Sequence, residues 1–142
     1  MIEINLHNSF DVSIDINSIS DLSNLILNKY DHISGKLNII ITDDESLRKM
    51  KINFFNEDVF TDVIAFNIED NPFEGEIYIS YDRVQDNARL YKQKFEEEFK
   101  RVIIHGLLHL CGHEDSTASE KENMSLLEDK FLNKFTHSVI KG

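Results

Sequence analysis

Four short apolar segments have the pattern of β-strands, at residues 2–6, 37–42, 63–68 and 76–80. The second contains three consecutive isoleucines, Ile39 to Ile41, which is typical of a buried strand. In the fourth, Ile77 and Ile79 share one face and polar residues occupy the other. Asn71 and Pro72 lie between the last two segments, so a surface turn is expected there.

Five other segments carry apolar residues at helical spacing. The first spans residues 22–30 and follows Ser18 and Ser20, either of which can cap a helix. The second follows Asp43 or Asp44, and its apolar residues are Leu47, Met50 and Phe54. Three more helices are expected at residues 82–91, 95–111 and 118–134.

The helix expected at residues 95–111 has the clearest apolar stripe. Its members lie on one side, as in a helix packed on a sheet, and they are Phe95, Phe99, Val102, Ile103 and Leu110. Gly112 then ends the helix. The order of elements predicts an α+β fold, in which a mixed four-stranded sheet packs against helices. No repeat or linker divides the sequence, so residues 1–142 are expected to form one domain.

Composition narrows the class of protein. With 15 basic and 26 acidic residues the formal charge is −11, which argues against a protein that coats nucleic acid through bulk positive charge. Because 41% of residues are hydrophobic, the chain can build a core without a disulfide or a structural metal. A single cysteine, the absence of a secretory signal and the absence of a long apolar segment predict a cytoplasmic protein that is not inserted in a membrane.

A pair of histidines near the end of the long helix carries the candidate chemistry. His105 and His109 are four residues apart, so they share one helix face with Cβ atoms roughly 6 Å apart. Their imidazoles can therefore converge on one metal ion. Gly112 can adopt the left-handed backbone that turns the chain back, which brings Asp115 toward the pair as a third ligand. Three ligands leave a fourth position for water, as in a catalytic zinc site.

His113 competes with Asp115 for the role of third ligand. A helix that continued from His105 to His113 would rise about 12 Å, too far for three rings to reach one ion, so Asp115 is favoured. Cys111 lies on the opposite side of the helix from His109 and is expected to be a small buried residue. A protease of the His-Glu-x-x-His type has its general base where this chain has Gly106, which weighs against peptide hydrolysis.

The segment from His105 to Asp115 resembles the signature H-G-x-L-H-L-x-G-Y-D-H of the YbeY family of metal-dependent endoribonucleases, the rRNA maturation factors. Residues 61–66 and 75–80 are similar to two strands of that family, T-D-V-L-S-F and G-D-I-x-I-S. Met124 and Glu128 match its closing M-x-x-x-E helix. The resemblance covers residues 47–132 well, and the first third by strand and helix order alone.

The resemblance implies that His105 and His109 are the first two zinc ligands. Asp115 stands where most members have a third histidine, a departure that a carboxylate oxygen tolerates while it adds negative charge. His113 and Glu114 replace the usual tyrosine and aspartate, and both are candidate proton carriers. Phe55 lies nearest to an arginine that many members carry before the threonine, so phosphate binding at that position is in doubt.

These observations predict an endoribonuclease that holds one zinc ion per chain and hydrolyses single-stranded RNA with a metal-activated water during rRNA maturation and ribosome biogenesis. The partners implied by the resemblance are ribosomal RNA, the ribosome and ribosomal proteins; the oligomeric state stays open. A basic rim formed by Arg83, Arg89, Lys92, Lys94, Lys100 and Arg101 is one way for an acidic protein to hold RNA. The alternatives are a non-catalytic, zinc-stabilised ribosome-assembly or RNA-binding protein, and a small metallopeptidase.

Overall fold

The computed structural model of the chain describes residues 1–141, so Gly142, the last residue of the expected domain, lies outside it. The strands are β1 (Ile2–Asn8), β2 (Gly35–Thr42), β3 (Val63–Asp70) and β4 (Phe73–Ser80). The helices are α1 (Ile16–Lys29), α2 (Asp44–Phe55), α3 (Tyr81–Leu90), α4 (Phe95–Leu110) and α5 (Ala118–Lys134). The predicted α+β class and the predicted order of elements are confirmed.

The strands form one mixed sheet in the order β1-β2-β4-β3, with β1, β2 and β4 parallel and the edge strand β3 antiparallel to β4. Because side chains alternate along a strand, each row of partners faces one side of the sheet. One row on the helix-covered face consists of Leu6, Ile39, Ile77 and Ala65. The neighbouring row on the opposite face consists of His7, Ile40, Tyr78 and Ile64.

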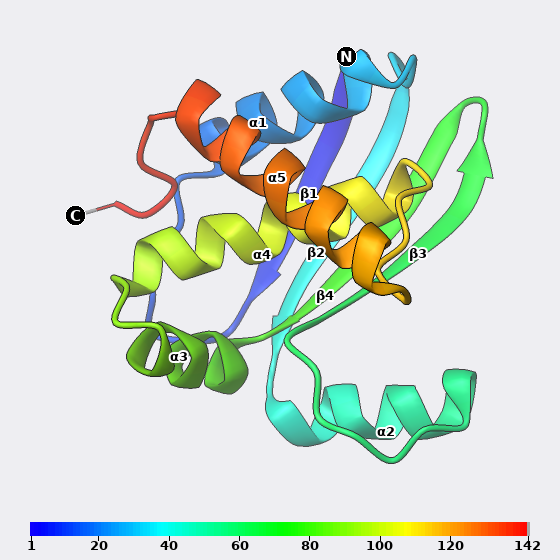
Figure 1. The fold of residues 1–142 in the computed structure, drawn as a ribbon. Helices are drawn as coiled ribbons and strands as arrows, with labels where there is room; N and C mark the ends of the chain where they lie inside the picture. The colour runs from blue at the N-terminus through cyan, green and yellow to red at the C-terminus, as the bar shows by residue number, and fades with distance from the viewer. Residues whose placement is uncertain (142) are drawn as a thin grey trace.

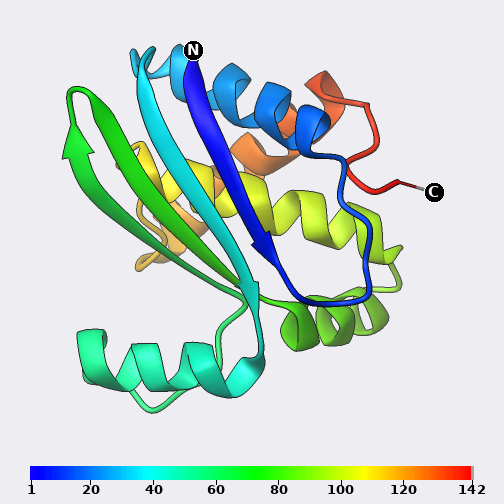
Figure 2. The ribbon, with the colours of Figure 1, turned by 180° about the vertical axis from the view of Figure 1, so that it is seen from behind.

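The helices form two layers on one face of the sheet. α1 and α4 lie beside the strands, α3 lies at one end of the sheet next to α4, and α5 crosses α4 on the side away from the sheet (Figure 1). Seen from behind, the other face of the sheet carries no helix, and α2 lies apart at one end of the strands (Figure 2). The core therefore lies between the sheet and α4, which is buried from both sides.

Close packing at Gly106 holds α4 against β3 and β4. A Cβ atom at this position would lie 3.0 Å from one methyl carbon of Ile77 and 3.2 Å from a methyl carbon of Val63. Ile103, Leu107 and Leu110, on the same side of α4, are 0–2% exposed. The predicted apolar stripe is thus confirmed, and it brings the C-terminal end of α4 to the edge strand.

The ends of several elements differ from the prediction. α1 begins three residues earlier than Ser18 suggests, because the Asp15 side chain accepts hydrogen bonds from the backbone N–H groups of Asn17 and Ser18. β3 and β4 both extend toward the turn at Asn71 and Pro72 and pair there, although their outer residues lack a regular apolar pattern. Pairing with a neighbouring strand, which supplies backbone hydrogen bonds, extends a strand beyond its apolar segment.

The three apolar residues named for α2 in the sequence differ in burial. Leu47 is the one residue of the helix that is fully buried, Met50 is partly buried, and Phe54 is 66% exposed. The helix is attached mainly at its N-terminus, where Asp44 accepts hydrogen bonds from Ser80 Oγ and Arg83 Nη2 at 2.8 and 2.6 Å. Its C-terminal half consequently leaves its apolar side chains in contact with solvent.

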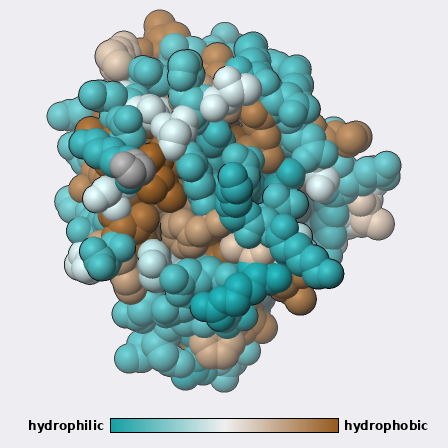
Figure 3. Space-filling model, turned by 90° about the vertical axis from the view of Figure 1, so that its left-hand side faces the viewer, coloured by the Kyte–Doolittle hydropathy of each residue, from teal (hydrophilic) through white to brown (hydrophobic). Residues whose placement is uncertain are grey.

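The remaining surface is mostly polar. On the side that Figure 3 shows, hydrophilic residues predominate and hydrophobic residues reach the surface between them. Ile14 and Ile140 form an isolated β-bridge, which closes the C-terminal segment against the loop before α1. Among residues 1–141 no helix is both long and apolar enough to cross a membrane.

We expect Gly106→Ala to destabilise the fold by about 1–3 kcal/mol, because the added methyl group overpacks the contact with Ile77 and Val63. At an unconstrained helical site the same change stabilises a protein by roughly 0.5–1 kcal/mol, since alanine has the better helix propensity. Urea denaturation therefore tests the packing by the sign of the change. A variant more stable than the parent protein would contradict it.

Candidate metal centre

The structure brings His105, His109 and Asp115 together beside β3. His105 Nε2 lies 3.0 Å from His109 Nε2 and 3.1 Å from Asp115 Oδ2, and His109 Nε2 lies 3.5 Å from the same oxygen. All three ligand atoms are within 4.8 Å of one another, and the three residues are partly buried. This geometry fits two imidazole nitrogens and one carboxylate oxygen around a single cation.

The turn after α4 delivers Asp115 to this position. Gly112 has φ +95°, in the left-handed region that glycine favours, and no neighbouring atom would meet a Cβ there. The backbone N–H groups of Gly112 and His113 donate to the carbonyls of His109 and Leu108, both at 3.0 Å. These bonds end the helix and reverse the chain, as the sequence predicts for this glycine.

Both histidines are oriented through Nδ1, which leaves Nε2 free for a metal. The His109 Nδ1–H donates to the backbone carbonyl of His113 at 2.8 Å. The His105 Nδ1–H donates to Glu128 Oε2 at 2.5 Å, and Glu128 on α5 is 6% exposed. A hydrogen bond to the second ring nitrogen fixes the tautomer and direction of a ligand histidine, so α5 takes part in building the site.

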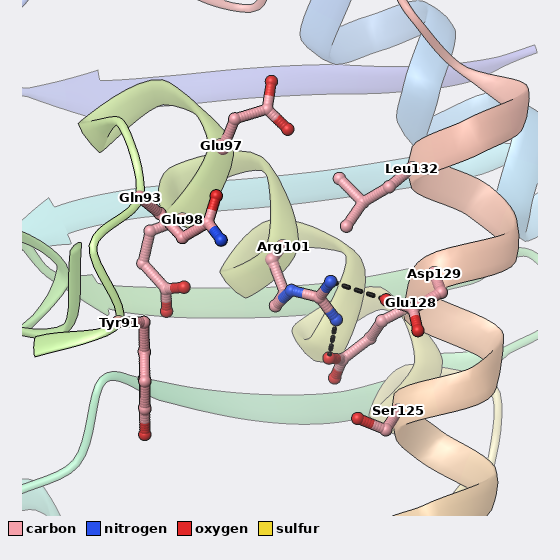
Figure 4. A pocket seen from close by; sticks show the side chains of 9 residues that line it. All are labelled: Tyr91, Gln93, Glu97, Glu98, Arg101, Ser125, Glu128, Asp129 and Leu132. Atoms are coloured by element: carbon pink, nitrogen blue, oxygen red, sulfur yellow. Dashed lines mark hydrogen bonds and ion pairs between the residues drawn. The ribbon is translucent and has the colours of Figure 1, made fainter.

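Arg101 connects Glu128 to the neighbouring pocket between α4 and α5. Its guanidinium donates to Glu128 Oε1 at 2.9 Å and to Asp129 Oδ1 at 2.6 Å, as the dashed lines in Figure 4 show. Glu128 therefore accepts from an arginine with one oxygen and from His105 with the other. The pair of contacts holds the carboxylate in place behind the histidine.

Glu128 also changes the proton affinity of His105. Burial lowers the pKa of His105, but the hydrogen bond to Glu128 and the charge of that carboxylate outweigh burial, and the pKa is raised above its ordinary value of 6.5. A protonated Nε2 cannot bind a metal, so a proton and a metal ion compete for this ring.

The ligand cluster opens into a cleft of about 460 Å³. It is lined by Lys51 and Phe55 of α2, by residues 61–65 and by the residues from Glu114 to Ser116. Glu114 is exposed, which is compatible with its predicted role in proton transfer. The three ligands thus share one cleft with the C-terminal half of α2.

Asp62 is a site residue that the sequence analysis missed. It lies in the cleft, accepts a hydrogen bond from Asn87 Nδ2 at 3.2 Å, and burial raises its pKa above the ordinary value, against the opposing effect of His105. Its position directly before the apolar segment of β3 was the available signal, because polar residues at strand ends often line sites. Without the tertiary structure nothing indicates that β3 runs beside α4.

The structure places the other candidate residues outside the ligand cluster. The His113 ring lies against α1, where its Nε2 is 2.9 Å from the hydroxyl oxygen of Tyr30. His113 therefore contributes its backbone carbonyl to the site while its imidazole is engaged elsewhere. Cys111 is partly buried where full burial was expected, and burial raises the pKa of its thiol to about 12.

Three of the six residues of the predicted basic rim are engaged in contacts within the protein. Lys100 is 4% exposed, and its Nζ donates to the backbone carbonyl of Phe135 at 3.3 Å. Arg83 is paired with Asp44, and Arg101 is held by the two α5 carboxylates. The other three, Arg89, Lys92 and Lys94, are exposed. Residues that are close in a helical sequence point to different sides of the molecule, so the six basic residues do not form one group of free charges.

A comparison with protein families identifies the chain: the family model described as "Endoribonuclease YbeY" matches residues 4–136. The chain belongs to the Endoribonuclease YbeY family. Proteins named Endoribonuclease YbeY include one from Christiangramia forsetii, 44% identical over 104 residues, which are 72% of this chain and 71% of that protein. One from Flavobacterium johnsoniae is 35% identical over 136 residues, 95% of this chain and 97% of the relative.

A solved structure shares the fold. The solution structure of TM1509 from Thermotoga maritima superimposes with a TM-score of 0.59 at 26% identity and covers 96% of this chain and 92% of that one. The family match confirms the resemblance found at residues 47–132 and extends it into the first third of the chain. The YbeY fold therefore includes β1 and α1, whose sequences resemble the family in element order alone.

We expect Glu128→Gln to weaken metal binding by about 10–100-fold, because the neutral amide no longer holds His105 with a negative charge. Asp129→Asn is the matched control, since Asp129 contacts the same Arg101 and does not contact His105. Isothermal titration of both variants with Zn²⁺ measures the effect. Equal losses of zinc affinity in the two variants would mean that the effect arises from the contact with Arg101 and not from the hydrogen bond to His105.

A second prediction concerns Glu98, which is 6% exposed and lies in the pocket of Figure 4, of about 380 Å³. Burial, with a smaller contribution from the charge of Asp62, raises the pKa of Glu98 from 4.5 to about 7. The folded protein thus holds a proton that the unfolded chain releases, and stability falls as pH rises from about 4.5 to about 7.

Glu98→Gln removes the carboxyl group whose ionisation destabilises the folded protein. We expect the variant to gain stability over the parent protein at pH 8 and to gain much less at pH 5, as measured by urea denaturation at both values. Glu97→Gln is the control, because Glu97 is the adjacent carboxylate and is exposed. A gain of the same size at both pH values would show that Glu98 is ionised throughout this range.

Proposed function

We propose that this chain is a zinc-dependent endoribonuclease that cuts single-stranded RNA in rRNA maturation. The observation that carries the proposal is the arrangement of three ligand atoms on one side of an open cleft. Two imidazoles and a carboxylate with a free direction toward the cleft suit a catalytic metal, whereas a structural zinc site is closed by four protein ligands. The names of the YbeY relatives supply the class of reaction.

A zinc ion held by His105, His109 and Asp115 would supply Lewis acidity, which would polarise a phosphoryl oxygen and lower the pKa of water toward neutrality. Glu128 and the His113 carbonyl orient the two rings so that both Nε2 atoms face the cleft. Asp62 and Glu114 line the same cleft and are the carboxylates positioned to hold or accept a proton. In this proposal residues 1–142 form a single functional domain.

Asp115 makes the ligand set more negative than in family members that have a third histidine. A carboxylate ligand adds one negative charge, which would make a water held by the ion a weaker acid. Imidazole ligands also suit nickel, copper and iron, so zinc is part of the proposal, and its support in the structure is a cluster of two histidines and one aspartate that could hold a metal ion.

Two alternative functions receive less support. A non-catalytic RNA-binding protein with a closed metal site needs a fourth ligand, and the ring of His113, the alternative ligand in the sequence, is bonded to Tyr30. A metallopeptidase of the His-Glu-x-x-His type needs a glutamate at position 106. That position is Gly106, and a Cβ atom there would already lie 3.0 Å from Ile77 and 3.2 Å from Val63.

Ribosomal RNA and ribosomal proteins are the proposed partners, and the cytoplasm is the proposed location because Cys111 is a free thiol that requires no oxidising compartment. The ligand residues project from a core whose packing does not depend on them, since the buried cluster consists of apolar side chains. Loss of the metal should therefore leave the fold standing.

We expect His109→Ala and Asp115→Ala each to abolish cleavage of an unstructured RNA oligonucleotide and to reduce bound zinc, while circular dichroism and the denaturation midpoint stay near those of the parent protein. His137→Ala, which removes an exposed histidine outside the cleft, should retain both activity and metal. Unfolding of the two ligand variants would identify the metal as structural. Peptide cleavage without RNA cleavage by the parent protein would favour the metallopeptidase.

A further inference from the structure

The C-terminal half of α2 and the loop after it expose an unusual number of large apolar side chains. Phe54 is 66% exposed, Phe55 43% and Phe60 52%, and Ile68 on the nearby edge strand is 52% exposed. Scattered single apolar residues need no explanation, but a contiguous group beside a cleft marks a surface that binds something. The proposed metal chemistry does not use these side chains.

The aromatic rings form a connected series around the edge of β3. Phe55 stacks on Phe66 with ring centroids 6.0 Å apart and planes inclined by 17°. Phe66 also meets Phe54 edge to face at 5.4 Å and Tyr78 at 6.0 Å. Phe66 and Tyr78 belong to the face of the sheet that carries no helix layer (Figure 2). The series thus runs from the metal cleft to the open face of the sheet.

A groove follows this series. It has a volume of about 330 Å³ and is lined by Met50, Phe54, Phe66, Asn67, Ile68, Glu76 and Tyr78. Phe55 connects it to the metal cleft, because Phe55 lines that cleft and stacks on Phe66. A ligand that occupies the groove can therefore extend continuously to the three metal ligands.

Lys51 provides the positive charge at the junction. It lies one helical turn before Phe55, lines the metal cleft, and its Nζ is 4.6 Å from the centre of the Phe55 ring. Its ion pair with Glu57 is long, at 3.8 Å, and the Glu57 side chain is 58% exposed. The ammonium group is therefore free to turn to an anion in the cleft. Many family members carry an arginine near position 55, where this chain has Phe55. Lys51, four residues earlier, supplies a positive charge instead.

We propose that this aromatic groove, formed by Phe54, Phe55, Phe66 and Tyr78, binds unpaired bases of the RNA substrate while Lys51 binds a backbone phosphate between the groove and the metal. The inference rests on the proposed function and deepens it. Flat aromatic faces suit nucleobases, each of which has a π face, and such stacking tolerates any sequence. Bases stacked in a helix cannot reach these rings, so the groove accounts for a preference for single strands.

Base stacking in the aromatic groove gives an acidic protein a way to bind RNA without a large positive surface. At a formal charge of −11 the molecule repels a polyanion at long range, and the free positive charge near the cleft is small. Stacking does not depend on net charge. Glu76, the charged residue lining the groove, can accept a hydrogen bond from an exocyclic amino group and disfavours a phosphate at the same place.

The test compares RNA binding by Phe54→Ala and by the parent protein. Both are made in a His109→Ala background so that no cleavage occurs, and affinity for an unstructured RNA oligonucleotide is measured by fluorescence anisotropy. We expect Phe54→Ala to weaken binding about 5–100-fold, the usual loss for one stacked base. Phe54→Tyr should bind like the parent. Leu126→Ala is the matched control, because Leu126 is 62% exposed on α5, outside the residues that line the groove.

An oligonucleotide of the same length with abasic residues separates base from backbone contacts. It should bind weakly to the parent protein, and Phe54→Ala should weaken its binding no further. Lys51→Gln should instead reduce the salt dependence of binding by about one phosphate contact for both oligonucleotides. Unchanged affinity in Phe54→Ala, or an equal loss for the abasic strand, would overturn the proposal, and unchanged affinity would leave the surface to a protein partner.

The outcomes also separate this inference from the proposed function. If the chain with intact ligands does not cleave RNA but Phe54→Ala still weakens binding of the base-containing strand, the proposed activity fails and the base-binding groove stands. If the chain cleaves RNA and Phe54→Ala changes neither affinity nor the KM of cleavage, the groove fails and the activity stands.

Discussion

The contact between α4 and the sheet at Gly106 is the constraint on which the rest of the molecule depends. With no side chain at this position, the helix lies against Ile77 and Val63, and its apolar stripe is buried along the sheet. His105 and His109 flank the contact on a neighbouring face of the same helix, so they are brought to the edge strand β3. How closely α4 packs against the sheet at Gly106 therefore determines where the metal ligands lie relative to the cleft.

Charge in this molecule is organised around the histidines. Glu128 stands behind His105 and is balanced by Arg101, while Asp62 and Glu98 are buried carboxylates whose pKa values are raised by burial. Most nearby cations are engaged with acidic partners. The site therefore concentrates negative charge at the place where a metal cation would bind. RNA recognition then depends on groups other than free lysine and arginine side chains.

The fold was predictable to a large extent, and the reasons are local. The nine elements within residues 1–141 follow from apolar spacing, and the pairing of His105 with His109 follows from helix geometry. Asp115 was accessible because Gly112 indicates a chain reversal of known geometry. Helix starts were less accessible, since Asp15 and two serines are all good capping residues and the packing of α1 chooses among them.

The surface and the surroundings of the site were not predictable in the same way. Glu128 lies 23 residues beyond His105, and Asp62 lies directly before the edge strand β3, so their meeting requires α5 to cross α4 and β3 to run beside it. The basic residues before the site suggested a rim, yet pairing and burial engage three of the six, Arg83, Lys100 and Arg101. The apolar residues of α2 did not indicate their own exposure, which follows from the place of that helix at the end of the sheet.

Local spacing within the chain thus determined the order of strands and helices, the metal-ligand types and the turn that joins them, because these depend on residues a few positions apart. Only the tertiary structure decided which carboxylate orients His105, which charges stay free and which aromatic rings face solvent. Those features depend on contacts between segments distant in sequence, and many packings of the same elements satisfy the same apolar pattern.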